Sequence, residues 1–310
     1  MLIHIGPVAN VPSWAWIGAD IAESIAQVRP VRFFHDVTEL PRGAMVVWIK
    51  QPPSGAALAV ARERQARLIF FPVDYFETLE HILEHQDFLT LCDLIVLHSP
   101  SLAACFSAGK VRHVDHYNKF GTDPALRQPG RQLLWVGGFQ YVPYVARYLL
   151  ESGLGTRHPV TLLTDSGNAS AARAAAELGR ELGLGAQFGV RELRGLATVE
   201  PWSVARQAEL LRTCRAAFDI KERGNFNQFH KPPTKLQKFV CSGVPPAINA
   251  GLPLASAFDL DIPEPADLDQ WLSPAYAASV TKRASALRRE LSAKNIAGRY
   301  LSFVAELERG

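Results

Sequence analysis

The chain has 310 residues, of which 48% are hydrophobic and 20% are charged, a balance that favours a packed core and excludes a wholly disordered polypeptide. At roughly 150 residues per domain, this length predicts about two domains. The net charge of +3 is too small to indicate nucleic-acid binding, and it suits anionic small molecules or a loose contact with an anionic membrane surface.

Short apolar runs alternate with segments of helical periodicity along the chain, a pattern typical of a parallel sheet covered by helices. In the first part, strands are predicted at Leu2–Ile5, Val31–Phe34, Met45–Ile49, Leu68–Phe71, Leu94–Leu97 and Val111–Val114. Helices are predicted at Trp14–Gln27, at Ala56–Gln65, from the turn at Pro72–Tyr75 to about His85, and at Ser99–Phe106.

A polar break at Gly121–Arg131 predicts a linker, and the alternation restarts after it. Strands are predicted here at Leu133–Val136, Val160–Thr164, Gln187–Leu193, Ala197–Val199, Ala217–Ile220 and Ala247–Asn249. Helices are predicted at Val142–Glu151, Ala169–Leu182, Ser203–Cys214, Thr234–Cys241 and Ala277–Leu307, with Ser203 as the cap of the third.

These elements predict an α/β protein of two Rossmann-like domains, residues 1–125 and 131–272, followed by a helical tail at 273–310. Doubly wound sheets bind ligands outside the carboxyl ends of their strands. Two such sheets that face each other would enclose a cleft. We therefore expect ligand loops after several strands of both domains.

The four cysteines include no C-x-x-C pair, so reduced thiols of a cytoplasmic protein are expected. No N-terminal signal is recognisable, and no run reaches the roughly 18 apolar residues that a membrane span needs. We expect a cytoplasmic protein, for which any contact with the inner membrane would be peripheral.

The segment Asn225–Asn249 is the most informative part of the sequence. It combines a polar loop, a helix that begins after Pro232–Pro233, a stop at Gly243 and a buried strand. Free N–H groups at the start of a helix attract anions, and the sequence places basic side chains beside them, namely His230, Lys231 and Lys235. The segment therefore predicts a site for a diphosphate.

The run Lys231-Pro232-Pro233-Thr234-Lys235-Leu236, followed by Gly243-Val244-Pro245, resembles the donor-binding segment of GT-B glycosyltransferases, Pro-x-Lys-x-x-Glu-x-x-Ala-x-Gly-x-Pro. Trp135-Val136-Gly137-Gly138 is similar to the first strand and glycine turn of the family's C-terminal domain. The likeness covers Leu133 to Asn249. It implies a GT-B fold, in which the last helix crosses back to brace the N-terminal domain.

The resemblance also implies the chemistry: a nucleotide-sugar donor held by the C-terminal domain, a saccharide or lipid-linked saccharide acceptor on the N-terminal domain, and no obligatory metal or other cofactor. Transfer to an acceptor hydroxyl would serve polysaccharide biosynthesis. The residues that match the donor segment, or stand where it binds the donor, are Gly137, Gly138, His230, Lys231, Thr234, Lys235 and Lys238.

Two departures from the family pattern leave alternatives open. Lys238 (or Gln237 in a shifted register) stands where the family has a ribose-binding glutamate. The turn after Gly138 reads Phe139-Gln140-Tyr141 and lacks the family's cations. A non-catalytic GT-B-like partner subunit or nucleotide-sugar-binding module is therefore the alternative hypothesis, and a related epimerase is a third.

On the N-terminal side, Asp74 follows a predicted strand. A carboxylate there can act as the general base on an acceptor hydroxyl or bind a sugar hydroxyl, and a simple turn aspartate is the alternative. His116 is expected to be structural. Trp14 and Trp16 are candidates for stacking on the acceptor or for the core.

His81-Ile82-Leu83-Glu84-His85 matches the H-x-x-E-H zinc motif. A motif match without structural context is weak evidence, and the sequence indicates no further ligand. We therefore interpret this stretch as the solvated face of a helix and expect no metal.

Overall fold

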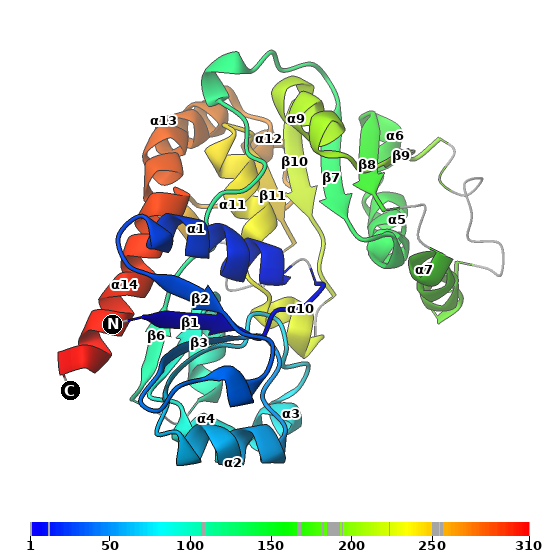
Figure 1. Cartoon of the computed structure of the whole chain (residues 1–310). Helices are drawn as coiled ribbons and strands as arrows, with labels where there is room; N and C mark the ends of the chain where they lie inside the picture. Colours follow the sequence, from blue (N-terminus) through cyan, green and yellow to red (C-terminus); the bar gives the residue numbers. More distant parts are fainter. Residues whose placement is uncertain are drawn as a thin grey trace. The chain divides into compact units, whose positions relative to one another are not determined.

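The computed structural model describes residues 2–11, 13–106, 109–165, 169–181, 183–184, 193, 195–222, 224–249, 254 and 257–309 (Figure 1). The chain forms two compact units. The first unit comprises Met1–Tyr117, Asn225–Pro232 and Arg289–Gly310, and the second comprises Asn118–Gly224 and Pro233–Arg288.

The first unit is built on a parallel sheet of six strands in the order β2-β1-β3-β4-β5-β6. Its strands are short and almost wholly apolar, as expected where helices cover both faces of a sheet. They are β1 (Ile3–Gly6), β2 (Val31–Phe33), β3 (Met45–Ile49), β4 (Arg67–Phe71), β5 (Leu94–Leu97) and β6 (Val111–His113).

Two neighbouring residues of β4 show how the two faces of this sheet are filled. Phe70 packs edge-on against Phe88, with ring centroids 4.8 Å apart, on the face covered by α2 (Gly55–Glu63), α3 (Leu79–Leu83) and α4 (Gln86–Leu91). Phe71 stacks on Tyr300 of α14 (Ala293–Arg309) at 4.5 Å, on the opposite face. Alternate residues of a strand point to opposite faces, so both layers are anchored by one strand.

Helix α14 completes the first unit by packing along α1 (Asp20–Ala26), as Figure 1 shows. Arg29 forms an ion pair with Glu308 at 2.5 Å, and Arg112 pairs with Glu306. The short helix α10 (Phe226–His230) also belongs to this unit, and Phe226 packs against its apolar core.

The second unit holds a parallel sheet in the order β11-β10-β7-β8-β9. Its strands are β7 (Leu133–Gly137), β8 (Val160–Thr164), β9 (Thr198–Pro201), β10 (Ala216–Asp219) and β11 (Pro246–Ile248). Its helices are α5 (Val142–Ser152), α6 (Leu154–Arg157), α7 (Ala169–Glu181), α9 (Val204–Thr213), α11 (Thr234–Cys241), α12 (Leu268–Trp271) and α13 (Pro274–Glu290).

The predicted strands agree with the structure to within one or two residues, except that Gln187–Leu193 lies almost wholly outside the described residues. The predicted α/β class is confirmed. Ser203 caps α9 by accepting a hydrogen bond from the backbone N–H of Arg206, as expected.

The helices differ from the prediction in three places. The stretch up to His85 is two short helices, and residues 100–105 form a 3₁₀ helix that begins at Pro100. The helical tail is two helices, α13 and α14, because Ser292 caps the second by accepting a hydrogen bond from the N–H of Asn295. Only the second of them lies in the first unit.

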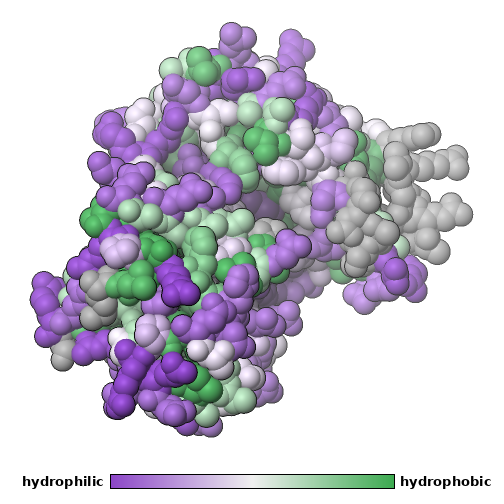
Figure 2. Space-filling model, in the orientation of Figure 1, coloured by the Kyte–Doolittle hydropathy of each residue, from purple (hydrophilic) through white to green (hydrophobic). Residues whose placement is uncertain are grey.

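Among the described residues, no helix has the length and apolarity required to cross a bilayer. Figure 2 shows polar side chains over most of the visible face, with apolar groups in separate patches. The most exposed large apolar residues, such as Val28, Leu83 and Leu126, come from distant parts of the chain. Scattered apolar residues of this kind are ordinary for a protein surface.

Candidate ligand sites at the carboxyl ends of the two sheets

In the second unit, the order of the strands reverses beside β7, which has β8 on one side and β10 on the other. Ligands of doubly wound sheets bind at such a switch point, beyond the carboxyl ends of the strands. Here these ends are Gly137 of β7 and Asp219 of β10. The side chain of Asp219 is buried, with only 3% of its surface exposed.

Lys235, in the first turn of α11, reaches into this switch point. Its Nζ lies 2.7 Å from Oδ1 of Asp219 and 4.9 Å from the centre of the Trp135 ring. A Cβ atom at Gly137 would come within 3.2 Å of the same Nζ and within 2.5 Å of the Trp135 ring. Glycine is therefore required at Gly137 for the backbone to pass this close to the ammonium group.

The N-terminus of α11 lies in the same region. Its N-cap is Pro233, whose side chain accepts no hydrogen bond, so Thr234 is the first helical residue and does not act as the cap that the sequence suggested. The helix has eight residues, and the first backbone N–H groups of a helix have no partner within it. This end therefore carries partial positive charge beside Lys235.

Lys238 lies one turn further along α11. Its Nζ donates a hydrogen bond to Oε1 of Gln207 at 3.1 Å and lies 5.8 Å from the centre of the Phe120 ring. Gln207 is fully buried, and the same oxygen accepts the indole N–H of Trp202 at 3.0 Å. Burial, together with the nearby charge of Lys235, lowers the pKa of Lys238 to about 8.

Two further contacts fix this end of the second sheet. The side chain of Asn249 accepts from the N–H of Lys221 at 3.0 Å and donates to its carbonyl at 2.7 Å, which ties the ends of β10 and β11 together. The turn after Gly138 is held by the N–H of Phe139, which donates to Oδ1 of Asp165 at 2.6 Å.

In the first unit, the strand ends carry an ionic cluster centred on Asp74, which follows β4. Lys50, directly after β3, places Nζ 3.1 Å from Oδ1 of Asp74. Lys231, directly after α10, places Nζ 3.6 Å from Oδ2. Burial raises the pKa of Asp74, but the charges of Lys231 and Lys50 outweigh this effect and hold it below its usual value. The carboxyl group is therefore ionised at neutral pH.

Two buried histidines stand at the next two strand ends. His98 follows β5 and His116 lies beyond β6, and their rings stack with centroids 4.0 Å apart. Burial lowers the pKa of His116 to about 3 and that of His98 well below its usual value, so both rings are neutral at physiological pH. Within the described part of the chain, His98 Nδ1 and both ring nitrogens of His116 have no hydrogen-bond partner.

The polar segment before Pro232 is bound to this same edge of the first sheet. His230 Nδ1 lies 3.0 Å from the hydroxyl of Ser101, and the side-chain amide of Asn227 donates to the carbonyl of Asp74 at 3.1 Å. Burial lowers the pKa of His230. The segment thus positions Lys231 next to Asp74.

Of the two tryptophans expected near an acceptor, Trp14 is buried against Phe33 and belongs to the core. Trp16 is only partly buried. Its ring lies 5.2 Å from that of His116, and its N–H donates to the carbonyl of Tyr117 at 3.2 Å.

Two hollows lie away from these sites. One of about 380 Å³ in the second unit is lined by Pro124, Arg127 and Trp271, among others, and one of about 470 Å³ in the first unit is lined by Arg67, Lys110 and Arg112. Both lie where strands begin, at the opposite edge of each sheet from the predicted ligand loops. Their position gives no support to a role in donor binding.

No protein-family model matches the chain, and no curated protein sequence is similar to it. Solved structures do resemble it. TarM matches 91% of this chain with a TM-score of 0.61 at 10% identity, and TarM from S. aureus has been crystallised with fondaparinux, α-GlcNAc-glycerol and UDP. The match spans 58% of TarM, so this chain corresponds to little more than half of that protein.

AviGT4, described as a glycosyltransferase involved in avilamycin A biosynthesis, matches the whole chain over 98% of its own length, with a TM-score of 0.51 at 13% identity. The chain has the GT-B fold. The Gap123 glycosylation-associated protein complex from Streptococcus agalactiae matches 86% of the chain, over 55% of its own, with a TM-score of 0.53 at 12% identity. Identities this low establish the fold alone.

Within the GT-B fold, the structure divides the residues that the sequence placed together. Gly137, Gly138, Thr234, Lys235 and Lys238 belong to the second unit. Asp74, His230 and Lys231 belong to the first unit, where the last two are bound to the loop and strand ends around Asp74.

Sequence reasoning missed Lys50 and His98 and treated His116 as structural only. The signal that could have found them is their position, since each directly follows or closely follows a predicted strand of the first sheet.

Proposed function

We propose that the chain transfers a sugar from a nucleotide-sugar donor to an acceptor hydroxyl, with the donor diphosphate bound by the second unit. The observation that carries this proposal is the position of Lys235 and the N-terminus of α11 at the switch point between β7 and β10, beside Gly137. The UDP bound in a TarM structure and the description of AviGT4 support it.

The chemistry of the diphosphate follows from this arrangement. An ammonium group has three N–H donors, and Asp219 accepts from one of them, so Lys235 keeps donors for phosphate oxygens. The free N–H groups of α11 add to its charge. Fixed positive charge of this kind stabilises the negative charge that develops on the leaving diphosphate as the sugar departs. This step requires no metal.

Lys238 adapts the site to its departure from the family pattern. It has no carboxylate with which to hold the ribose, and its partner Gln207 is neutral. We infer that Lys238 adds positive charge on the diphosphate side. His230 and Lys231 are bound within the first unit, so the proposal rests on Lys235, Lys238 and α11 for the donor.

The first unit would bind the acceptor, a saccharide or a lipid-linked saccharide. Asp74 is the candidate catalytic residue, because an ionised carboxylate accepts a hydrogen bond from the attacking hydroxyl. Its two lysines make it a weaker base, so positioning the hydroxyl is the larger part of this role. The unpartnered nitrogens of His98 and His116 offer hydrogen bonds to further hydroxyls, and Trp16 offers an aromatic face.

The donor site is tested by calorimetric titration of purified protein with UDP, with other nucleoside diphosphates and with their sugar derivatives. Lys235→Ala should weaken binding about 10- to 100-fold, as expected when a charged hydrogen bond is lost. Lys282→Ala is the matched control, since Lys282 is exposed and belongs to the same unit. Equal affinities in all three proteins, or no binding to any nucleotide, would refute the proposal.

A non-catalytic partner subunit remains the second candidate, because Lys238 replaces the ribose-binding carboxylate and the Gly138 turn carries no cation. The likeness to the Gap123 complex is in keeping with it. Product analysis separates the two hypotheses. A transferase releases nucleoside diphosphate and forms a glycosylated acceptor, whereas a binding subunit leaves the nucleotide sugar intact at saturating donor.

A further inference from the structure

The first unit carries a cluster of metal-ligand side chains that the transfer chemistry does not use. Thr78 caps α3 by accepting a hydrogen bond from the N–H of His81, which fixes the start of this helix. His81, Glu84 and His85 then follow at positions i, i+3 and i+4, which share one face of a helix. The helix ends at Leu83, and α4 begins directly after His85.

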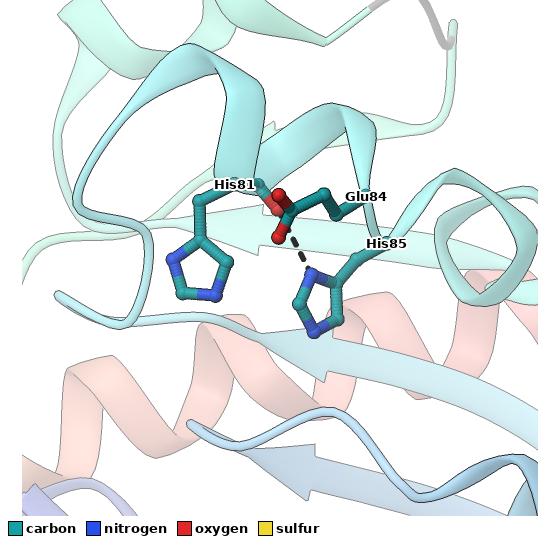
Figure 3. Close-up of side chains that lie close together, drawn as sticks. All are labelled: His81, Glu84 and His85. Atoms are coloured by element: carbon teal, nitrogen blue, oxygen red, sulfur yellow. Dashed lines mark hydrogen bonds between the residues drawn. The ribbon is translucent and has the colours of Figure 1, made fainter.

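The three side chains converge at this corner between α3 and α4. One ligand atom from each lies within 4.8 Å of the other two, and Figure 3 shows the two imidazole rings side by side with the carboxylate of Glu84 next to them. The imidazoles are partly buried and Glu84 is exposed. Tyr75 and Phe76 pack against both rings, with centroids 4.9 to 5.9 Å apart.

His85 is already oriented as a metal-binding histidine would be. Its Nδ1 lies 2.9 Å from the carbonyl oxygen of His81 (dashed in Figure 3), and a carbonyl only accepts, so Nδ1 carries the proton. In the neutral ring, the lone pair is therefore on Nε2. Histidine ligands of metals commonly donate their other N–H to a backbone carbonyl, which fixes the ring and its tautomer.

The remaining contacts of the two rings are weak enough for a metal to replace. The hydroxyl of Tyr75 lies 3.4 Å from Nε2 of His85, and the N–H of Glu77 lies 3.5 Å from Nδ1 of His81. Both distances are at the long end for hydrogen bonds. The Nε2 atom of His85 is thus held in place without a strong competitor.

The cluster needs only a modest contraction to coordinate a metal. Ligand atoms about 2.0–2.1 Å from a tetrahedral Zn²⁺ lie roughly 3.3 Å from one another. The exposed side chain of Glu84 can rotate toward the imidazoles without disturbing the core.

We propose that His81, Glu84 and His85 bind a single divalent cation of the Zn²⁺ type, with water in the remaining position beside Tyr75. Imidazole with carboxylate suits Zn²⁺ and its neighbours rather than Mg²⁺ or Ca²⁺. The bound ion joins α3 to α4 and, through Tyr75, reaches the loop that carries Asp74. The interpretation of this stretch as a solvated helical face lacked a third ligand, and the geometry supplies Glu84.

The test uses full-length, tag-free protein stripped of metal with EDTA. Titration with ZnCl₂ in a calorimeter should show one site per chain, and Co²⁺ should give the intense visible absorption of a four- or five-coordinate ion. His81→Gln/His85→Gln should abolish both signals, and Glu84→Gln should weaken Zn²⁺ binding about 10-fold or more.

His35→Gln is the matched control, because His35 is an exposed histidine of the same unit that lies outside the cluster. It should bind Zn²⁺ as the unaltered protein does. Far-UV circular dichroism in EDTA checks that each variant is folded. The proposal is overturned if the unaltered protein binds no Zn²⁺ at micromolar concentration, or if the double variant and the His35→Gln control bind it equally.

Discussion

The two sheet edges contain the same charged groups in different arrangements. Each brings two lysines and one aspartate together, but in the first unit both lysines lie against Asp74. In the second unit only Lys235 pairs with Asp219, whereas Lys238 is bound to a neutral amide.

This difference separates two kinds of ligand. The charge on Lys238 has no carboxylate opposite it in its printed contacts, and the neighbouring Lys235 makes the site more cationic, which suits a diphosphate. At the first edge the carboxylate is compensated, and two neutral histidines stand beside it. That combination suits the hydroxyl groups of a neutral sugar.

The largest effect is expected from breaking the buried pair of the second unit. Lys235→Ala leaves the carboxylate of Asp219, 3% exposed, without its cation, which should lower the free energy of unfolding by about 3 kcal/mol. Lys235→Gln/Asp219→Asn, which removes both charges, should lose less than half of that. Urea denaturation measures both values, and equal losses would show that the pair contributes little.

A second test alters the first edge alone. Asp74→Asn should reduce transfer to the acceptor about 100-fold, because the attacking hydroxyl loses its ionised partner. Affinity for the nucleoside diphosphate should be unchanged, since the donor is assigned to the second unit. Rates with acceptor and calorimetry with nucleotide give the two readouts. A loss of nucleotide affinity in this variant would contradict the division of roles between the two edges.

The pH dependence of nucleotide binding sharpens the assignment of Lys238. Its pKa is lowered to about 8, so the ammonium is charged below that pH and loses its charge above it. Affinity for a diphosphate should therefore fall about 10-fold between pH 7 and pH 9. Lys238→Met should bind more weakly at pH 7 and lose this dependence. An unchanged pH profile in the variant would show that Lys238 does not face the nucleotide.

The same pKa shift has a consequence for stability. The unfolded chain keeps the ordinary, higher pKa of lysine, so between about pH 8 and 10.5 it binds more protons than the folded chain at this residue. The contribution of Lys238 to stability therefore rises over this range.

The smallest effect concerns the stacked histidines. His116→Phe removes two buried nitrogens that have no partner among the described residues and keeps the size and shape of a ring. Stability should be unchanged or higher by about 1 kcal/mol, while the KM for the acceptor rises several-fold. Thermal unfolding and steady-state kinetics measure these values. A destabilised variant with normal acceptor kinetics would assign His116 to the core alone.

The sequence predicted the strands well because each is a short apolar run between turn residues, as in Met45–Ile49 and Val160–Thr164. It predicted the helix at Thr234–Cys241 to the residue, from the prolines before it and Gly243 after it. Lys235 at the end of the second sheet follows from the same pattern.

Other features depend on contacts between distant residues, which local patterns do not encode. Lys231 and Lys235 are four residues apart, yet the proline pair between them leads the first to Asp74 and the second to Asp219. The cluster of His81, Glu84 and His85 depends on a helix that ends at Leu83. Lys50 has a positive φ of 70°, and nothing in the sequence indicates this.

The composition of the first unit has a consequence for how the protein is made. Its sheet is complete once Tyr117 has been synthesised, but the cation beside Asp74 arrives with Lys231, and the helix that covers one face arrives with residues 293–309. The ion pair between Arg29 and Glu308 closes over 279 positions of sequence. On the ribosome, the first unit begins to form before the second but acquires its final layer after the second is whole, so a fragment that ends at Tyr117 would leave Phe71 without the ring of Tyr300.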